Sequence, residues 1–311
     1  MSDDIIAALD LGSNTFRLML AGRCGQIWAE KKVFQHIPRL SEHLEPGGAF
    51  APEALKRAWE ALDDFAVEVC KAGAGKVLAG ATMAARLAAD GPDFLAEINR
   101  RYGWEARILT GKEEAELTAA GVLAEISPLP SAAMIFDIGG RSTEFVTTCG
   151  RTIKQSRRLP MGVVKLTEAH LSAPANAAEL KAVAEEVQAV MAKADFSDMT
   201  PNATLIGTAG TVTTVAALLM NLTEYRPELV NNACISGQKI DELLTVLASE
   251  TIEERVNRHS LHPRRADAIV AGLVMVLEIL NFFNRNDLVV SDNGLLEGIW
   301  LAAAGLTDFP D

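Results

Sequence analysis

One stretch of the chain, residues 137–144, combines residue types that could bind a phosphate and a metal ion. It reads Asp-Ile-Gly-Gly-Arg-Ser-Thr-Glu, with two carboxylates around two glycines and two hydroxyls. Backbone N–H groups in a glycine turn can approach an anion closely. A flanking carboxylate can hold a divalent cation that neutralises the same phosphate. An ordinary glycine-rich hairpin with a surface aspartate would show the same pattern, since short glycine motifs are common.

This pattern occurs twice in the chain. Residues 5–15 align without gaps on residues 132–142, an offset of 127 residues that places Asp10 on Asp137 and Gly12 on Gly139. Each copy combines an apolar strand, an Asp-x-Gly turn and a second strand. A repeat of this length is too long for a solenoid unit. It predicts two duplicated domains, each starting with a hairpin whose turn could face the other across a cleft.

A third glycine loop, residues 207–211, reads Gly-Thr-Ala-Gly-Thr and follows a short apolar run. It precedes a predicted helix, whose free N–H groups and dipole would favour an anion. The alternative is a tight turn in which a threonine caps the helix. As the third loop of this kind, it is predicted to bind phosphate.

Two glutamates, Glu113 and Glu114, lie in the first turn of a helix predicted from Thr110 to about residue 125. Glu113 has capping-box spacing to Thr110. Glu114 would point in a different direction from Glu113 and is expected to be free for a role other than capping. A glutamate can orient or deprotonate water during hydrolysis of a phosphoanhydride, although carboxylates in a first turn are usually capping or dipole partners.

Arginines lie in or near the predicted loops at positions 17, 86 and 141. Guanidinium groups suit phosphate oxygens, but scattered arginines are usually surface charge. Arg141 differs because it lies inside the glycine loop. The histidines form no ligand or triad pattern, and neither a P-loop nor a nucleophile elbow occurs.

Length and composition set the broad class of the protein. The chain has 311 residues, 49% of them hydrophobic, and a formal net charge of −12. Alternating helix and strand patterns predict an α/β fold in two domains, 1–127 and 128–311, with the last helix, about 294–306, able to pack back on the first. The negative charge argues against generic nucleic-acid binding and leaves phosphate binding to local clusters, backbone amides and a metal.

Cysteines and apolar segments indicate the compartment. The cysteines are far apart, which predicts buried free thiols in a reducing cytosol; they are Cys24, Cys70, Cys149 and Cys234. The acidic N-terminus is unlike a secretory signal. The apolar segment 266–283 contains Asp267, Glu278 and Asn281, so a core helix is predicted rather than a membrane span. We therefore expect a cytoplasmic protein.

Five motifs occur in order: Asp10–Thr15, Thr110–Ala115, Asp137–Glu144, Gly207–Thr211 and Ser291–Gly298. Linking segments 81–86, 159–168 and 265–272 fit the same pattern. Together they resemble the exopolyphosphatase and guanosine pentaphosphate phosphatase family over essentially the whole chain.

The resemblance implies the actin-like ATPase (ribonuclease H-like) fold, in which two related α/β domains bind phosphates in the cleft between them. It implies release of terminal phosphate from inorganic polyphosphate, from guanosine pentaphosphate or from both, with Mg²⁺ or another divalent cation. The expected ligands are polyphosphate and guanosine penta- or tetraphosphate. The chain matches the short, two-domain form of the family, and we expect a homodimer.

The resemblance also assigns roles by position. Glu114 matches the catalytic glutamate that activates water. Asp137 and Glu144 match metal-associated and catalytic carboxylates, and Asp10, the acidic residue of the first loop, is a predicted metal ligand. The predicted substrate contacts are Gly12, Ser13, Asn14, Arg17, Arg86, Gly139, Gly140, Arg141, Ser142, Thr143, Gly207, Thr208, Gly210 and Thr211.

Two positions depart from the family pattern. Arg141 stands where a third glycine is usual, so it either adds a phosphate ligand or obstructs the loop. Ala209 stands where glycine is common, which narrows the available backbone conformations. Two other functions therefore stay open: an ATP-dependent small-molecule kinase of the same fold, and a non-catalytic polyphosphate or nucleotide sensor in which Arg141 has abolished turnover.

Overall fold

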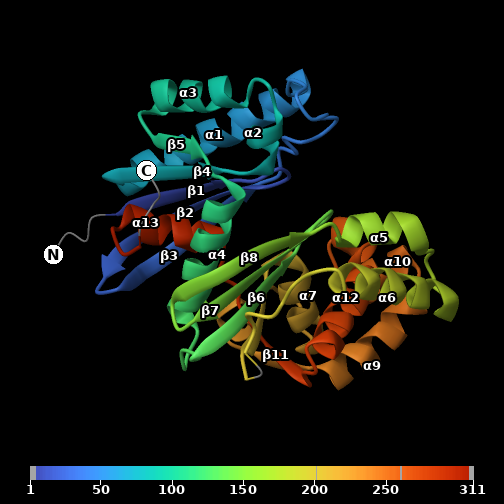
Figure 1. The fold of residues 1–311 in the computed structure, drawn as a ribbon. Helices are drawn as coiled ribbons and strands as arrows, with labels where there is room; N and C mark the ends of the chain where they lie inside the picture. The colour runs from blue at the N-terminus through green and yellow to red at the C-terminus, as the bar shows by residue number, and fades with distance from the viewer. Residues whose placement is uncertain (1–4, 201, 260, 308–311) are drawn as a thin grey trace. The chain divides into compact units, whose positions relative to one another are not determined.

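The chain forms two compact units in a computed structural model that describes residues 5–200, 202–259 and 261–307. The first unit comprises residues 1–124 and 294–311, and the second comprises residues 125–293. Helix α13 (Leu295–Ala303) thus belongs to the first unit although it follows the second in sequence. Each unit is built on one β-sheet with helices packed against it (Figure 1).

The first unit contains a five-stranded sheet in the order β3-β2-β1-β4-β5. The first three strands form an antiparallel meander, whereas β1, β4 and β5 are parallel. The strands are β1 (Ile6–Leu11), β2 (Phe16–Cys24), β3 (Ile27–His36), β4 (Lys76–Ala81) and β5 (Glu105–Ile108).

Alternate residues of β1 enter two different hydrophobic cores. Leu9 and Leu11 pack with α1 and α3, whereas Ile6 and Ala8 pack with α13, on the other face of the sheet (Figure 1). Burial on both faces explains why β1 is apolar throughout until Asp10. The other helices of this part of the chain are α1 (Pro52–Ala72), α2 (Met83–Leu87), α3 (Gly91–Tyr102) and α4 (Gly111–Glu125).

The second unit contains a six-stranded sheet in the order β10-β11-β9-β6-β7-β8. Strands β6, β7 and β8 again form an antiparallel meander, and β6, β9 and β11 are parallel. The strands are β6 (Ala132–Ile138), β7 (Thr143–Cys149), β8 (Thr152–Leu159), β9 (Thr204–Thr208), β10 (Cys234–Ser236) and β11 (Asp287–Val290).

Helices of the second unit gather on one face of its sheet (Figure 1). The apolar segment predicted to be a core helix forms α12, which supplies Leu273 and Met275 to the same core as Phe136 of β6. Within the described residues, no helix has the length and apolar character needed to cross a membrane. The helices are α5 (Val163–His170), α6 (Ala177–Met191), α7 (Ala209–Leu219), α8 (Pro227–Val230), α9 (Gly237–Ala248), α10 (Ile252–His259), α11 (Pro263–Ala266) and α12 (Ile269–Phe282).

The duplication predicted from the two Asp-x-Gly stretches extends through both sheets. Strands β3-β2-β1-β4-β5 of the first unit have the same order and directions as β8-β7-β6-β9-β11 of the second. Strand β10 is an addition to the second sheet. The predicted α/β class with duplicated domains is therefore confirmed.

The prediction of buried cysteines was wrong, because all four thiols are free and exposed. Cys24 and Cys149 end strands β2 and β7, Cys234 begins β10, and Cys70 lies in the last turns of α1. Side chains at the ends of elements project beyond the core, so apolar patterning does not reach them.

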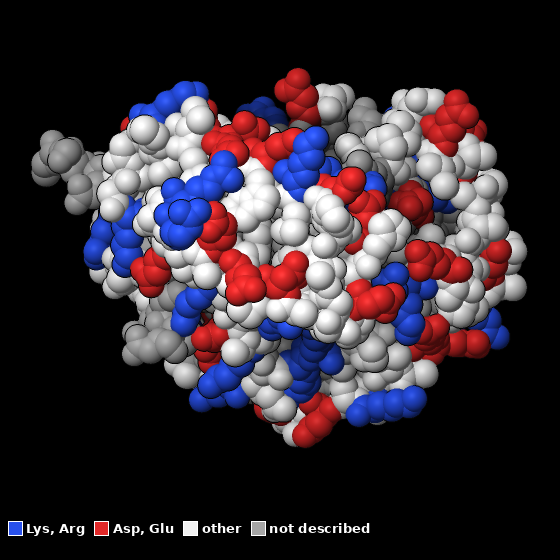
Figure 2. All heavy atoms as spheres, turned by 90° about the horizontal axis from the view of Figure 1, so that it is seen from above, with Lys and Arg blue, Asp and Glu red and all other residues white. Residues whose placement is uncertain are grey.

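Charged side chains of both signs are interspersed over the face of the molecule shown in Figure 2. Ion pairs between neighbouring side chains occur in the described residues, such as Arg100 with Glu97 and Arg101 with Asp63. This face presents no broad basic surface of the kind that generic nucleic-acid binding requires.

Candidate active site

The first glycine loop is the tight turn between β1 and β2. The amide of Gly12 donates to the Thr15 carbonyl at 3.1 Å. A Cβ atom at residue 12 would lie 2.7 Å from that carbonyl oxygen, so only glycine fits. The Ser13 hydroxyl accepts a hydrogen bond from the Ala84 amide at 3.1 Å, which ties the loop to α2.

Asp10 and Arg17 face each other across the first hairpin. They are direct register partners on β1 and β2. Arg17 donates to Oδ2 of Asp10 from Nη2 at 2.6 Å and from Nε at 3.2 Å. Asp10 is only 6% exposed, so the carboxylate of the first loop has its charge balanced locally.

The second glycine loop closes with the same turn. The amide of Gly139 donates to the Ser142 carbonyl at 2.9 Å. The carbonyls of Gly139 and Gly140 accept hydrogen bonds from the amides of Val163 and Val164, at 3.0 and 2.9 Å. The loop thereby caps the N-terminus of α5, which fixes its backbone.

Asp137, Glu144 and Arg158 form a row across three strands. Asp137 is the register partner of Glu144 on β6 and β7, and Glu144 is the partner of Arg158 on β8. Arg158 Nε lies 3.0 Å from Glu144 Oε1, and the Ser142 hydroxyl donates to the same oxygen at 2.8 Å. Two carboxylates directly opposite each other repel, and Arg158 supplies one positive charge against two negative ones.

Arg141 is compatible with the turn of the second loop. Its φ is negative, so the backbone does not need glycine at this position. The side chain is exposed and makes no hydrogen bond or ion pair within the part of the chain that the structure describes. The loop forms the same turn as its counterpart at Gly12, so Arg141 does not obstruct its backbone.

The third loop connects β9 to α7 and contacts the second loop. The Thr211 hydroxyl donates to the Ile138 carbonyl at 3.0 Å, next to Gly139. Arg265 Nη1 donates to the Gly210 carbonyl at 3.3 Å. Ala209 adopts a left-handed backbone with a φ of +61°, a conformation that costs a non-glycine residue energy.

Two predicted phosphate ligands have buried hydroxyl groups. The Thr143 side chain is fully buried and donates to the Met161 carbonyl at 2.8 Å. The Thr208 side chain, 2% exposed, donates to the Asn293 carbonyl at 2.7 Å and does not cap α7. Any phosphate contact from these residues would therefore come from the backbone rather than the hydroxyl.

Glu113 caps α4 as predicted. Its carboxylate accepts from the Thr110 amide at 2.5 Å, and the Thr110 hydroxyl accepts from the Glu113 amide at 3.2 Å. Burial acts to raise the pKa of the Glu113 carboxyl, but the hydrogen bonds from Thr110 and the nearby Arg107 outweigh burial and hold the pKa below its ordinary value.

Glu114, the proposed water-activating residue, forms an ion pair with a second predicted site residue, Arg86. Arg86 Nη1 lies 2.8 Å from Glu114 Oε2 and also donates to the Leu109 carbonyl at 2.6 Å. Two predicted site residues thus form an ion pair that links α2 to α4. The Glu114 side chain remains 31% exposed, so water can reach it.

Arg158 was missed by sequence reasoning. Its role depends on the pairing register between β7 and β8, which places it beside Glu144. No local pattern predicts this register, because β7 and β8 include a β-bulge that shifts the pairing by one residue.

The residues of the second loop fit a magnesium ion. Among the described residues, no three His, Cys, Asp or Glu side chains gather into a ready-made metal site. Mg²⁺ commonly uses one or two carboxylates and completes its shell with water and substrate phosphates. The opposed pair Asp137 and Glu144 supplies two carboxylates of this kind, and Oε1 of Glu144 also contacts Arg158 and Ser142.

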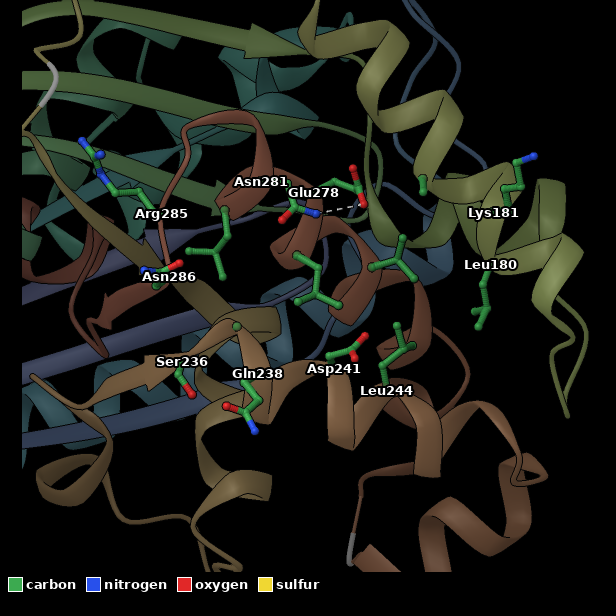
Figure 3. Close-up of a pocket in the computed structure, with 15 residues that line it drawn as sticks. Leu180, Lys181, Ser236, Gln238, Asp241, Leu244, Glu278, Asn281, Arg285 and Asn286 are labelled. Carbon is green, nitrogen blue, oxygen red and sulfur yellow. Dashed lines mark hydrogen bonds between the residues drawn. The ribbon is translucent and has the colours of Figure 1, made fainter.

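An open pocket of about 680 Å³ lies between α6, α9 and α12 of the second unit (Figure 3). Apolar side chains such as Leu180 and Leu244 line it together with the charged Lys181, Asp241 and Glu278. Its lining shares no residue with the second or third loop, so this pocket is separate from the predicted site.

Comparison with known proteins relates the chain to one family. The model of the Ppx/GppA phosphatase family matches residues 31–305. Exopolyphosphatase 2 of Mycobacterium tuberculosis is 30% identical, with 96% of this chain and 98% of that protein covered. A guanosine-5'-triphosphate,3'-diphosphate pyrophosphatase of Vibrio atlanticus is 25% identical over 96% of this chain and 59% of its own length.

A solved structure confirms the fold. The Aquifex aeolicus member of the Ppx/GppA family superimposes with a TM-score of 0.87 at 27% identity, covering 96% of this chain and 97% of that one. Together with the duplicated sheet order, this similarity confirms the predicted actin-like ATPase fold.

Proposed function

The chain belongs to the Ppx/GppA phosphatase family, and we propose that it releases terminal orthophosphate from inorganic polyphosphate, guanosine pentaphosphate or both. Its relatives include proteins named as an exopolyphosphatase and as a guanosine-5'-triphosphate,3'-diphosphate pyrophosphatase. The observation that carries the proposal is the pair Asp137 and Glu144, which face each other beside a rigid glycine turn. Family membership favours hydrolysis over the kinase and sensor alternatives.

Glu114 is the proposed general base. Hydrolysis forms a bond from the water oxygen to the terminal phosphorus and breaks the bond to the bridging oxygen, which leaves with the shortened chain. Glu114 accepts the proton that the water loses. Arg86, at 2.8 Å, holds this carboxylate in place.

Phosphate stabilisation is assigned to the glycine loops. N–H groups of the loops at Gly12, Gly139 and Gly210 would donate to phosphate oxygens, and their fixed backbones avoid reorganisation during the reaction. Asp137 and Glu144 of the second loop would hold Mg²⁺, whereas Asp10 of the first loop is paired with Arg17. When bound, the cation neutralises charge on the phosphate oxygens.

The substitution Glu114→Gln tests the role of the base. We expect orthophosphate release to fall by at least about 100-fold while substrate binding is retained, because the amide keeps the shape but cannot accept the proton. Glu116→Gln is the matched control, since this more exposed glutamate lies on the same helix and pairs with Lys112. Undiminished release by Glu114→Gln would refute the assignment.

Magnesium dependence is tested on the opposed carboxylates. Asp137→Asn and Glu144→Gln should raise the Mg²⁺ concentration needed for half-maximal rate, because each removes one negative donor. Activity that survives complete chelation of divalent cations would contradict the proposed cofactor. The homodimer and the cytoplasmic location remain predictions.

A further inference from the structure

Positive charge is concentrated around the second loop. Residues 137–168 contain six Lys or Arg residues and three Asp or Glu residues, whereas the whole chain has a net charge of −12. This segment forms the second loop, β7, β8 and the first half of α5. A local excess of positive charge next to a predicted phosphate site would attract a longer anion.

Strand β8 leads directly away from the second loop. It is an edge strand of the sheet, and its C-terminal residue Leu159 pairs with Thr143 at the loop. Arg158 lies at this end beside Glu144. Lys154 lies four residues further along, about 13 Å away for an extended strand, and Arg151 lies in the turn beyond it.

A β-bulge fixes the position of Lys154. Thr147 and Thr148 of β7 pair with Gln155 and Ile153, so Lys154 is the extra residue of β8. A bulge re-aims a side chain and interrupts the ladder. Lys154 is exposed and forms no ion pair or hydrogen bond with its side chain among the described residues.

Other cations of the segment are used within the fold. Arg157 pairs with Asp198 and packs over the ring of Phe196, and Lys165 pairs with Glu186 at 2.9 Å. Arg141 and Lys154 differ because their exposed charges have no such partner in the described parts of the chain. Arg141 lies at the loop and Lys154 lies four residues from Arg158 along β8, so both belong to one row of basic residues.

We propose that a path at the β8 edge binds internal phosphates of a linear polyphosphate chain whose terminal phosphate occupies the second loop. The path consists of Arg141 of the second loop, Arg158 and Lys154 of β8, and Arg151 of the turn before β8. The inference rests on the proposed function. Residues 150–159 contain no aromatic side chain on which a nucleobase could stack, and stacking is a main source of affinity for single-stranded nucleic acids. The edge therefore selects a chain of phosphates over a nucleotide.

The substitution Lys154→Ala tests the path away from the loop. The KM for long-chain polyphosphate should rise about three- to fivefold, as expected for loss of one exposed charge contact, and its salt dependence should weaken. The KM for tripolyphosphate and for guanosine pentaphosphate should stay at the wild-type value, because neither reaches Lys154. Lys154→Arg should restore the KM for long chains.

Lys239→Ala is the matched control, since Lys239 is an exposed lysine on α9 of the same unit and forms no side-chain ion pair within the ranges that the structure describes. It should leave every KM unchanged. An equal KM for long chains in wild type and Lys154→Ala would overturn the path while leaving the proposed function intact. Displacement of long-chain polyphosphate by polyuridylate at equal charge concentration would also overturn it.

Failure of the proposed function gives a different result. A wild-type protein that releases no orthophosphate from any of the three substrates would refute hydrolysis. Equilibrium binding of long-chain polyphosphate would then still test the path, since Lys154→Ala should weaken it by the same factor. Equal binding by both proteins would overturn the path in that case as well.

Discussion

The two glycine hairpins share a backbone and differ in the charge opposite the aspartate. Both turns close with the same hydrogen bond, Gly12 to Thr15 and Gly139 to Ser142. Asp10 faces Arg17, and at the matching position Asp137 faces Glu144. The first pair is a closed ion pair, whereas the second gathers negative charge. The same backbone thus forms a turn with a closed ion pair in the first unit and the proposed cation site in the second.

The helices that follow β5 and β11 show a similar division. Both begin with a glutamate three residues after the N-cap, which accepts a backbone hydrogen bond: Glu113 in α4 and Glu297 in α13. The next residue is Glu114 in α4 and Gly298 in α13. A Cβ atom at Gly298 would lie 1.9 Å from the Leu117 carbonyl, so this position serves helix packing. The duplicated scaffold places its proposed base in one copy and its proposed metal carboxylates in the other.

The largest effect is expected from making the second hairpin like the first. Glu144→Arg would place a cation opposite Asp137, as Arg17 is placed opposite Asp10. We expect orthophosphate release to fall by at least about 100-fold, because a guanidinium would replace a metal ligand. Steady-state rates over a range of Mg²⁺ concentrations measure this. Retained activity would show that the opposed carboxylates are not needed.

Removing the ion pair between Asp10 and Arg17 should lower the stability of the first unit. Arg17→Met leaves the buried Asp10 carboxylate without its two hydrogen bonds, which should lower the free energy of unfolding by about 2 kcal/mol. All four tryptophans, Trp28, Trp59, Trp104 and Trp300, belong to the first unit, so their fluorescence during urea unfolding reports on it. Arg158→Met, whose side chain is 48% exposed, is the control and should change the circular-dichroism unfolding curve little.

The two helix caps should differ in strength. Glu297 is 2% exposed and pairs with Lys31 at 2.8 Å, so Glu297→Ala should destabilise the first unit by about 2 kcal/mol. Glu113→Ala removes a more exposed cap and should cost about 1 kcal/mol. Tryptophan fluorescence reports both changes, and equal losses would remove the distinction between the caps.

Acid should abolish the contribution of Glu113. Its pKa in the folded protein is lowered from an ordinary value of 4.5. The stabilisation is therefore present above that value and is lost as pH falls through the folded pKa. The difference in unfolding free energy between wild type and Glu113→Ala should shrink below pH 4.5. A difference that persists at lower pH would contradict a charged cap.

The smallest change concerns Ala209, whose left-handed backbone suits glycine. Ala209→Gly should raise the thermal unfolding midpoint of the second unit through a gain of about 1 kcal/mol. Ala81 is the counterpart of Ala209 in the first unit and serves as the matched control. Gly80 pairs with Asp10 as Thr208 pairs with Asp137, so the residues that follow them, Ala81 and Ala209, correspond. Ala81 is buried within β4, so Ala81→Gly should be destabilising. A loss of stability in Ala209→Gly would refute the strain.

Local sequence by itself determined the repeated hairpins, the alternation of strands and helices along the chain, and the Glu113 cap. Each depends on residues close together in the chain, such as glycine at a tight turn or Thr110 three residues before Glu113. The family resemblance added the roles of Glu114 and the loop residues, which remain predictions.

Tertiary structure alone decided which distant side chains meet. The register of β8 places Arg158 on Glu144, packing of α2 near α4 places Arg86 on Glu114, and core packing buries the hydroxyls of Thr143 and Thr208. These pairings depend on strand register and packing between segments far apart in sequence, which no local pattern encodes. The sequence therefore predicted the glycine loops, whereas only the fold determined which charged side chains lie next to Asp10 and Asp137.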